Sequence, residues 1–180
     1  YLFIGPPLHE SYEKFYSFSR EQAIQAVSYY REYYEEKGMF ENEVYPGIKE
    51  LLRVLTKQGI LCLVATSKPE IYAKKILDYY KLRTYFHYIA GANMDGTRTD
   101  KAEVIAYALK QIPAEYNNKK ILMVGDRSHD IIGAKKNGID CAGVLFGYGS
   151  REELEEAGAD FVADSVEAVR NIILLDTAMN

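Results

Sequence analysis

Two aspartates four positions apart follow a strongly apolar segment in the second half of the chain. Asp126 and Asp130 lie in the stretch MVGDRSHDIIGAKKNGID, residues 123–140, and Asp126 directly follows the mainly apolar segment 120–125. The apolar run predicts a buried strand, and Asp130 begins a predicted helix, where its charge suits the helix N-terminus. Carboxylate oxygens at a strand end suit Mg²⁺, which also takes waters and a substrate phosphate. The pattern therefore indicates a magnesium site, and a helix cap beside a solvated turn residue is the alternative.

Hydroxyl groups and cations occur after another predicted strand and at the start of a further helix. Thr66, Ser67 and Lys68 follow the apolar run 60–65 and could donate hydrogen bonds to phosphate oxygens. Ser-Lys-Pro-Glu is also a good helix start, so a simple N-cap is the alternative. Lys101 begins a predicted helix, where a cation costs about 0.3–1 kcal/mol unless an anion lies nearby. The alternative for Lys101 is a solvated surface side chain.

The pattern after residue 46 predicts how these side chains are positioned. Continuous apolar runs of strand length alternate with amphipathic helices, which implies a parallel sheet covered on both faces. Ligands bind beyond the carboxyl ends of the strands in such sheets. We therefore expect an α/β fold with a Rossmann-like parallel sheet sandwiched by helices over residues 46–180. The expected strands are 60–65, 86–91, 120–125, 141–147 and 160–163, and the expected helices are 46–58, 69–82, 101–112, 130–138, 151–158 and 165–175.

Residues 1–45 interrupt this alternation and have an all-helical pattern. A capping box at Ser19 predicts the start of a long helix, and a shorter helix at about 8–16 is expected to pair with it. A helical hairpin of this size is too small to be stable alone. We therefore expect residues 5–45 to form a small all-helical cap that packs on the α/β core as a lid, with a hinge near residues 40–47.

Composition narrows the class of protein. The chain has 180 residues, of which 48% are apolar and 27% are charged, and its net charge is −4. These values predict a globular protein and argue against a nucleic-acid partner, which requires a basic face. No apolar run approaches the roughly 20 residues of a membrane span. Cys62 and Cys141 fall in predicted buried segments, which favours a reduced cytoplasmic location. The sequence leaves open whether the protein is a monomer or a homodimer.

The order of these motifs resembles that of the haloacid dehalogenase-like (HAD) hydrolase superfamily. Over nearly the whole chain it is most similar to the phosphoglycolate-phosphatase and 5′-nucleotidase-like branch, which carries a small helical cap. VATSKPE resembles the second motif, with Thr66 as the phosphate-binding hydroxyl, and Lys101 matches the lysine of the third. VGDRSHDIIGAKKNG resembles the fourth, with Asp126 as the Mg²⁺ ligand and Asp130 supporting the metal shell. The resemblance implies a Mg²⁺-dependent phosphatase that hydrolyses a small phosphorylated metabolite.

The first motif of that superfamily, Asp-x-Asp-Gly-Thr, has no counterpart in the expected place. Its first aspartate forms an aspartyl-phosphate and its second acts as the general acid and base. That motif ends a strand before the cap, and here only YLFIG, residues 1–5, precedes the predicted cap. NMDGT, residues 93–97, is a poor substitute because Asn93 is a weak nucleophile and the order is wrong; its Asp-Gly predicts a turn. We expect a fragment of a longer enzyme, since a missing central strand would leave two strand edges open.

Substrate contacts and other functions are less constrained by the sequence. Ser67, Lys68, His9 and Arg31 are candidates for substrate binding, although Arg31 could equally be solvated. His129 lies between the two aspartates, but a single loop histidine is more often solvated than a ligand, so no role is assigned to it. The alternatives are a sugar-phosphate mutase, a phosphonate or haloacid hydrolase, a non-catalytic binding module and a receiver-like phosphoacceptor. The carboxylate pair disfavours a dehalogenase, and the predicted cap disfavours a receiver.

Overall fold

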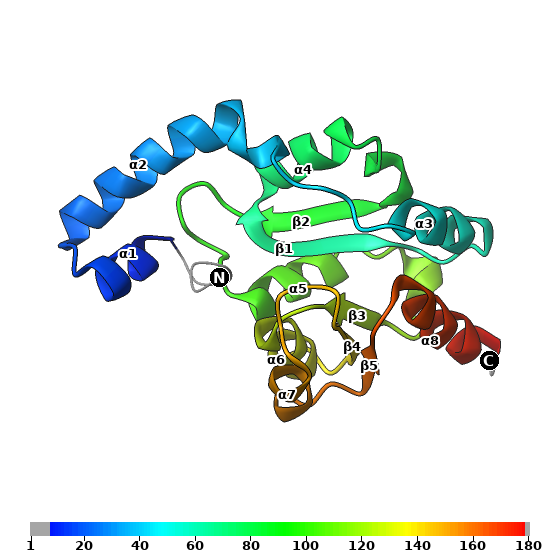
Figure 1. Ribbon diagram of the computed structural model, residues 1–180. Coiled ribbons are helices and arrows are strands. Elements are labelled where there is room, and N and C mark those ends of the chain that lie inside the picture. The colour runs from blue at the N-terminus through cyan, green and yellow to red at the C-terminus, as the bar shows by residue number, and fades with distance from the viewer. Residues whose placement is uncertain (1–7, 179–180) are drawn as a thin grey trace. The chain divides into compact units, whose positions relative to one another are not determined.

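The computed structural model describes residues 8–178 and divides the chain into two compact units, Tyr1–Glu43 and Val44–Asn180 (Figure 1). The predicted cap, residues 5–45, overlaps the first unit and includes two residues of the second, and its residues 5–7 lie outside the described residues. Its action as a lid stays a prediction. Among the helices of residues 8–178, none combines the length and apolar character needed to cross a membrane.

The first unit is a helical hairpin. The capping box predicted at Ser19 is confirmed: Gln22 N donates to Ser19 Oγ at 3.3 Å, and Ser19 N donates to Gln22 Oε1 at 2.8 Å. Ala23 of the long helix and Met39 of the turn that follows it are fully buried. The elements are α1 (Leu8–Tyr16), α2 (Arg20–Glu36) and the 3₁₀ turn η1 (Gly38–Phe40).

The second unit contains parallel strands, which confirms the predicted α/β class. β1 pairs with β2, β3 pairs with β4 and β4 pairs with β5, so the strands form a two-stranded and a three-stranded sheet (Figure 1). Parallel pairing places the carboxyl ends of neighbouring strands at the same edge. The strands are β1 (Leu63–Pro69), β2 (Tyr88–Ala92), β3 (Leu122–Gly125), β4 (Asp140–Val144) and β5 (Phe161–Ala163).

Helices cover these sheets as the sequence pattern predicted. α4 and α5 both pack against β1 and β2, from opposite sides in Figure 1, while α6 packs against β3 and β4. α7 packs against β4 and β5, and α8 contacts both β5 and α3. The helices are α3 (Ile48–Lys57), α4 (Glu70–Tyr79), α5 (Lys101–Leu109), α6 (Ser128–Lys136), α7 (Arg151–Glu156) and α8 (Val166–Ala178), with 3₁₀ turns η2 (Arg83–Tyr85) and η3 (Ala114–Tyr116).

The first predicted strand was displaced along the chain. The expected range was 60–65, but β1 begins at Leu63 and continues to Pro69, so Thr66 lies inside the strand and not after it. Pairing with β2 sets this end, because Thr66 lies opposite Gly91 and Pro69 lies opposite Ala92, with an irregularity between them. Backbone pairing with a neighbour is not visible in the apolar pattern of a single strand, which explains the error.

The residues of β1 and β3 are more exposed than those of β2 and β4. Most residues of β2 and β4 are buried, whereas those of β1 and β3 are only half-buried or exposed. Val124 in β3 is 37% exposed, while Ala142, its partner in β4, is 0% exposed. Within the described residues, β1 and β3 each pair with one strand only. Each of them therefore has an open edge.

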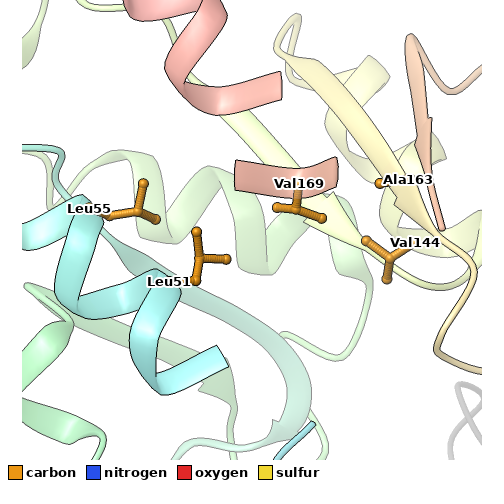
Figure 2. Packing of buried hydrophobic residues seen from close by; sticks show 5 residues of the cluster. All are labelled: Leu51, Leu55, Val144, Ala163 and Val169. Carbon is orange, nitrogen blue, oxygen red and sulfur yellow. The ribbon is translucent and has the colours of Figure 1, made fainter. Parts of the chain in front are cut away.

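A hydrophobic cluster connects the part of the unit that contains β1 with the part that contains β3. Leu51 and Leu55 of α3 lie toward Val169 of α8, which in turn lies near Val144 of β4 and Ala163 of β5 (Figure 2). All five residues are buried. Burial of apolar surface is the main favourable contribution to folding, so this cluster stabilises the unit as a whole.

Leu55→Ala should reduce the free energy of unfolding by about 2–5 kcal/mol, because a buried leucine is replaced and a cavity is left. Leu175→Ala is the matched control, since Leu175 of α8 is 66% exposed and the same change there should cost less than about 0.5 kcal/mol. Urea unfolding followed by circular dichroism measures both. Equal losses in the two variants would show that the cluster does not stabilise the unit.

Candidate functional site

Lys101 is the first residue of α5, and its side chain reaches two different parts of the unit. Its Nζ donates to the carbonyl oxygen of Ala65 in β1 at 3.2 Å and forms an ion pair with Asp130 Oδ1 at 2.8 Å. The Lys101 side chain is only 15% exposed, so this pair is largely shielded from water. The anion that would offset an unfavourable cation at a helix start is therefore present.

Asp130 is buried, and both of its carboxylate oxygens have polar partners. Oδ1 accepts from Lys101, and Oδ2 accepts from the backbone N–H groups of Asp126 and Arg127, both at 3.1 Å. A Cβ at Gly125 would lie 2.3 Å from the Cβ of Asp130, so glycine is required for this close approach. The predicted helix start at Asp130 was late, since α6 begins at Ser128 and Asp130 lies in its first turn.

Asp126 is held by the loop that follows β4. Tyr148 N donates to Asp126 Oδ2 at 2.8 Å, and Gly149 N donates to the Asp126 carbonyl oxygen at 2.9 Å. A Cβ at Gly147 would lie 2.3 Å from the Asp126 Cβ, so this loop can approach only with glycine there. The predicted strand 141–147 ends at Val144 instead, because residues 147–149 turn back onto Asp126.

The hydroxyl motif lies beside the lysine. Thr66 follows Ala65, the residue whose carbonyl oxygen accepts from Lys101, and Thr66 Oγ1 accepts a hydrogen bond from Lys68 N at 3.2 Å. Thr66 and Ser67 are half-buried, whereas Lys68 is exposed. The structure therefore connects the Ala65–Thr66 segment of β1 with Lys101, Asp130 and Asp126, which directly follows β3.

Arg98 organises the neighbouring loop and was missed by sequence reasoning. Its Nε donates to the Gly91 carbonyl oxygen at 2.8 Å, and its Nη2 donates to Asn93 Oδ1 at 3.0 Å and Glu70 Oε2 at 3.3 Å. The guanidinium also lies 3.8 Å from the ring centroid of Tyr107, a cation–π contact. Arg98 adopts the unusual φ of 52°, which the sequence did not signal. Arg98 thereby fixes the loop that leads into Lys101.

The intervening NMDGT stretch forms the predicted turn. Asn93 N donates to the Thr97 carbonyl oxygen at 3.0 Å, and Asp95 Oδ1 accepts from Thr97 N and Oγ1 at 2.9 and 2.7 Å. Its carboxylate is thus used to shape the turn. Hydrogen bonds from Thr97 lower the pKa of Asp95, so this acid is ionised at neutral pH.

Glu153 is a second residue that the sequence did not reveal. This acid in the first turn of α7 has Oε1 accepting from Ser128 N at 2.8 Å and from Arg127 Nε at 2.9 Å. Burial alone would raise the pKa of Glu153, but these hydrogen bonds outweigh it and hold the pKa below its ordinary value. An ionised Glu153 therefore fixes the two residues that follow Asp126. Its only sequence signal was an acid near a predicted helix start.

The remaining residues predicted to bind substrate belong to the first unit. His9 and Arg31 belong to the first unit, where His9 Nε2 lies 3.7 Å from Glu10 Oε1 and Arg31 is half-buried in α2. Their contact with substrate stays a prediction. His129, to which no role was assigned, is exposed.

The donor set suits a magnesium ion that is held by few protein ligands. Asp130 has both oxygens committed, and Asp126 has only Oδ2 in a hydrogen bond with the described residues, which leaves Oδ1 for a cation. Across residues 8–178, no group of three or more histidine, cysteine, aspartate or glutamate side chains could hold a metal. Mg²⁺ typically uses one or two carboxylates with water and phosphate, so Asp126 fits as one such ligand.

Known proteins are similar to this chain in sequence and in fold. A 5′-nucleotidase from Pseudomonas aeruginosa is 39% identical over 173 residues, which cover 95% of this chain and 76% of that protein. The tyrosine-protein kinase PtkA from Mycobacterium tuberculosis is 36% identical over 173 residues, and this chain spans only 58% of that kinase's length. The crystal structure of a predicted phosphatase from Clostridium acetobutylicum matches with a TM-score of 0.86 and 45% identity, covering 96% of this chain and 79% of that one.

The family assignment follows from the motifs, the fold and the match to a family model. The model for haloacid dehalogenase-like hydrolases matches residues 1–144, which include Thr66, Lys101, Asp126 and Asp130. The resemblance drawn from the motifs is thereby confirmed. The chain belongs to the haloacid dehalogenase-like hydrolase family.

Proposed function

We propose that this protein is the greater part of a Mg²⁺-dependent phosphatase that hydrolyses a small phosphomonoester. One observation carries the proposal: an unbroken series of hydrogen bonds runs from the Ala65 carbonyl oxygen through Lys101 and Asp130 to the backbone of Asp126. Thr66 follows Ala65 in the chain, so the series supports a site that combines its hydroxyl with a largely shielded cation and two carboxylates. These groups suit a phosphate dianion and a divalent cation.

Each residue has a role that its contacts support. Thr66 Oγ1 and nearby backbone N–H groups would hold the phosphoryl oxygens, with Ser67 and Lys68 as further donors. Lys101 would stabilise the negative charge that develops in the transition state, in a site where water is largely excluded. Asp130 would keep Lys101 and the Asp126 loop in place. A Mg²⁺ bound by Asp126 would offset the charge repulsion between the phosphate and an attacking carboxylate.

The attacking carboxylate would come from an additional strand that lies between β1 and β3. The open edges of these strands and the high exposure of Val124 support a parallel strand in that place. Lys101 contacts both β1 and α6, so a strand there would end beside Lys101. Its aspartate would attack phosphorus and displace the alcohol of the ester to form an aspartyl-phosphate, and water would then release inorganic phosphate and regenerate the aspartate, as the resemblance to the family implied.

The relatives support phosphoryl chemistry without fixing the substrate. Their names include a 5′-nucleotidase and a tyrosine-protein kinase, which differ in the group that accepts the phosphoryl. Nucleoside monophosphates, phosphoglycolate and sugar phosphates all carry the phosphomonoester that this site suits. A mutase-like member and a non-catalytic binding module are the alternatives. We expect a cytoplasmic monomer or homodimer with His9 and Arg31 of the first unit contributing to substrate choice.

The 180-residue chain alone should not hydrolyse p-nitrophenyl phosphate with Mg²⁺, because the proposed nucleophile lies outside it. A longer protein that includes the additional strand should release inorganic phosphate with many turnovers per enzyme. Phosphate release measured colorimetrically for the two proteins, side by side, decides the point. Turnover by the 180-residue chain would show that the nucleophile lies within it.

Asp126→Asn in the longer protein should lower kcat by about 100-fold, because an amide is a weaker ligand for Mg²⁺ than a carboxylate. Asp140→Asn is the matched control: Asp140 is an exposed aspartate at the opposite, amino end of β4. Initial rates over a range of Mg²⁺ concentrations measure both variants. If Asp126→Asn keeps the rate and the Mg²⁺ dependence of the control, the assignment of Asp126 is wrong.

A further inference from the structure

We propose that Glu153 is a positioning residue for Asp126. It lies outside residues 1–144, which match the family model. The inference rests on the proposed function, because Asp126 is the proposed Mg²⁺ ligand. Glu153 does not contact the Asp126 carboxylate itself and acts through the two residues that follow Asp126 in the chain.

The first connection is direct. Glu153 Oε1 accepts from Ser128 N at 2.8 Å and from Arg127 Nε at 2.9 Å, so one carboxylate oxygen fixes both residues that follow Asp126. The side chains of Glu153 and Arg127 are 27% and 26% exposed, so the pair is mostly shielded from water. Hydrogen bonds to a charged acceptor are stronger than neutral ones, which favours a single geometry for this turn.

The second connection runs through the loop before α7. Ser150 caps α7, since its Oγ accepts from Glu153 N at 3.2 Å. The same loop supplies Tyr148 N to Asp126 Oδ2 and Gly149 N to the Asp126 carbonyl oxygen. The side chain of Glu153 thus contacts residues 127 and 128, while its backbone N–H connects to the loop whose residues 148 and 149 donate to Asp126. The result is that Oδ2 is occupied and Oδ1 is the oxygen left for a cation.

Two variants of α7 separate this role from a general effect of charge. Glu153→Gln keeps the shape of the side chain but removes its charge. Glu155→Gln is the control, because Glu155 lies on the same helix and pairs with Arg151 at 3.2 Å, with 54% of its side chain exposed. Hydrogen exchange followed by NMR reports the amides of Ser128 and Tyr148 in the parent chain and both variants. A thermal unfolding curve for each of the three proteins checks that it is folded at the working temperature.

Glu153→Gln should speed exchange of both amides by about tenfold, while Glu155→Gln leaves them unchanged. The Tyr148 amide is the sharper probe, because Tyr148 N donates to Asp126 and not to Glu153. In the active, longer protein, Glu153→Gln should weaken Mn²⁺ binding, measured by electron paramagnetic resonance, by about tenfold and leave the KM for substrate near its parent value.

Each result bears on one claim. Unchanged exchange at Tyr148 in both Glu153→Gln and Glu153→Ala would overturn the positioning role, whatever the activity. Faster exchange with Mn²⁺ affinity within twofold of the Glu155→Gln control would also overturn it, since the loop would then move without affecting the ligand. A parent protein that binds no Mn²⁺ would instead count against the proposed function.

Discussion

The buried ion pair between Lys101 and Asp130 is the contact on which the candidate site depends. Lys101 comes from a helix that packs on β1 and β2, and Asp130 comes from a helix that packs on β3 and β4. Removing two charges from water costs several kcal/mol per ion unless hydrogen bonds compensate. Here the Ala65 carbonyl oxygen and two backbone N–H groups provide them. The pair therefore connects the two sheets and places the hydroxyl motif beside the carboxylate motif.

One type of hydrogen bond, from a backbone N–H group to a carboxylate at a helix start, occurs three times around this pair. In three helices, a carboxylate in the first turn accepts hydrogen bonds from backbone N–H groups at or shortly after the carboxyl end of a strand. Glu70 of α4 receives Gly91 N at 3.4 Å, Asp130 of α6 receives the N–H groups of Asp126 and Arg127, and Glu153 of α7 receives Ser128 N. A negative charge at a helix N-terminus is favourable in itself, so each acid stabilises its helix and orders a loop. The candidate site is thereby built from the first turns of helices as much as from strands.

The sequence predicted the parts of this arrangement that follow from local pattern. Alternating apolar runs predicted the α/β class, and the order of Thr66, Lys101, Asp126 and Asp130 predicted the family. The end of β1 was wrong because it depends on pairing with β2. Arg98 and Glu153 were missed because their roles arise from partners 28 and 25 residues away, such as Glu70 and Ser128. Long-range partners of this kind leave no periodic signal in the chain.

A double-mutant cycle on Lys101 and Asp130 tests the central claim most directly. Lys101→Met and Asp130→Asn should each lower the free energy of unfolding by about 3 kcal/mol, because each leaves a buried polar partner unpaired. The double variant should lose about 2 kcal/mol less than the sum of the two, the coupling expected of contacting residues. Lys135 and Asp160, an exposed pair, provide the control cycle and should couple more weakly. Additive losses at Lys101 and Asp130, measured by urea unfolding, would contradict the account.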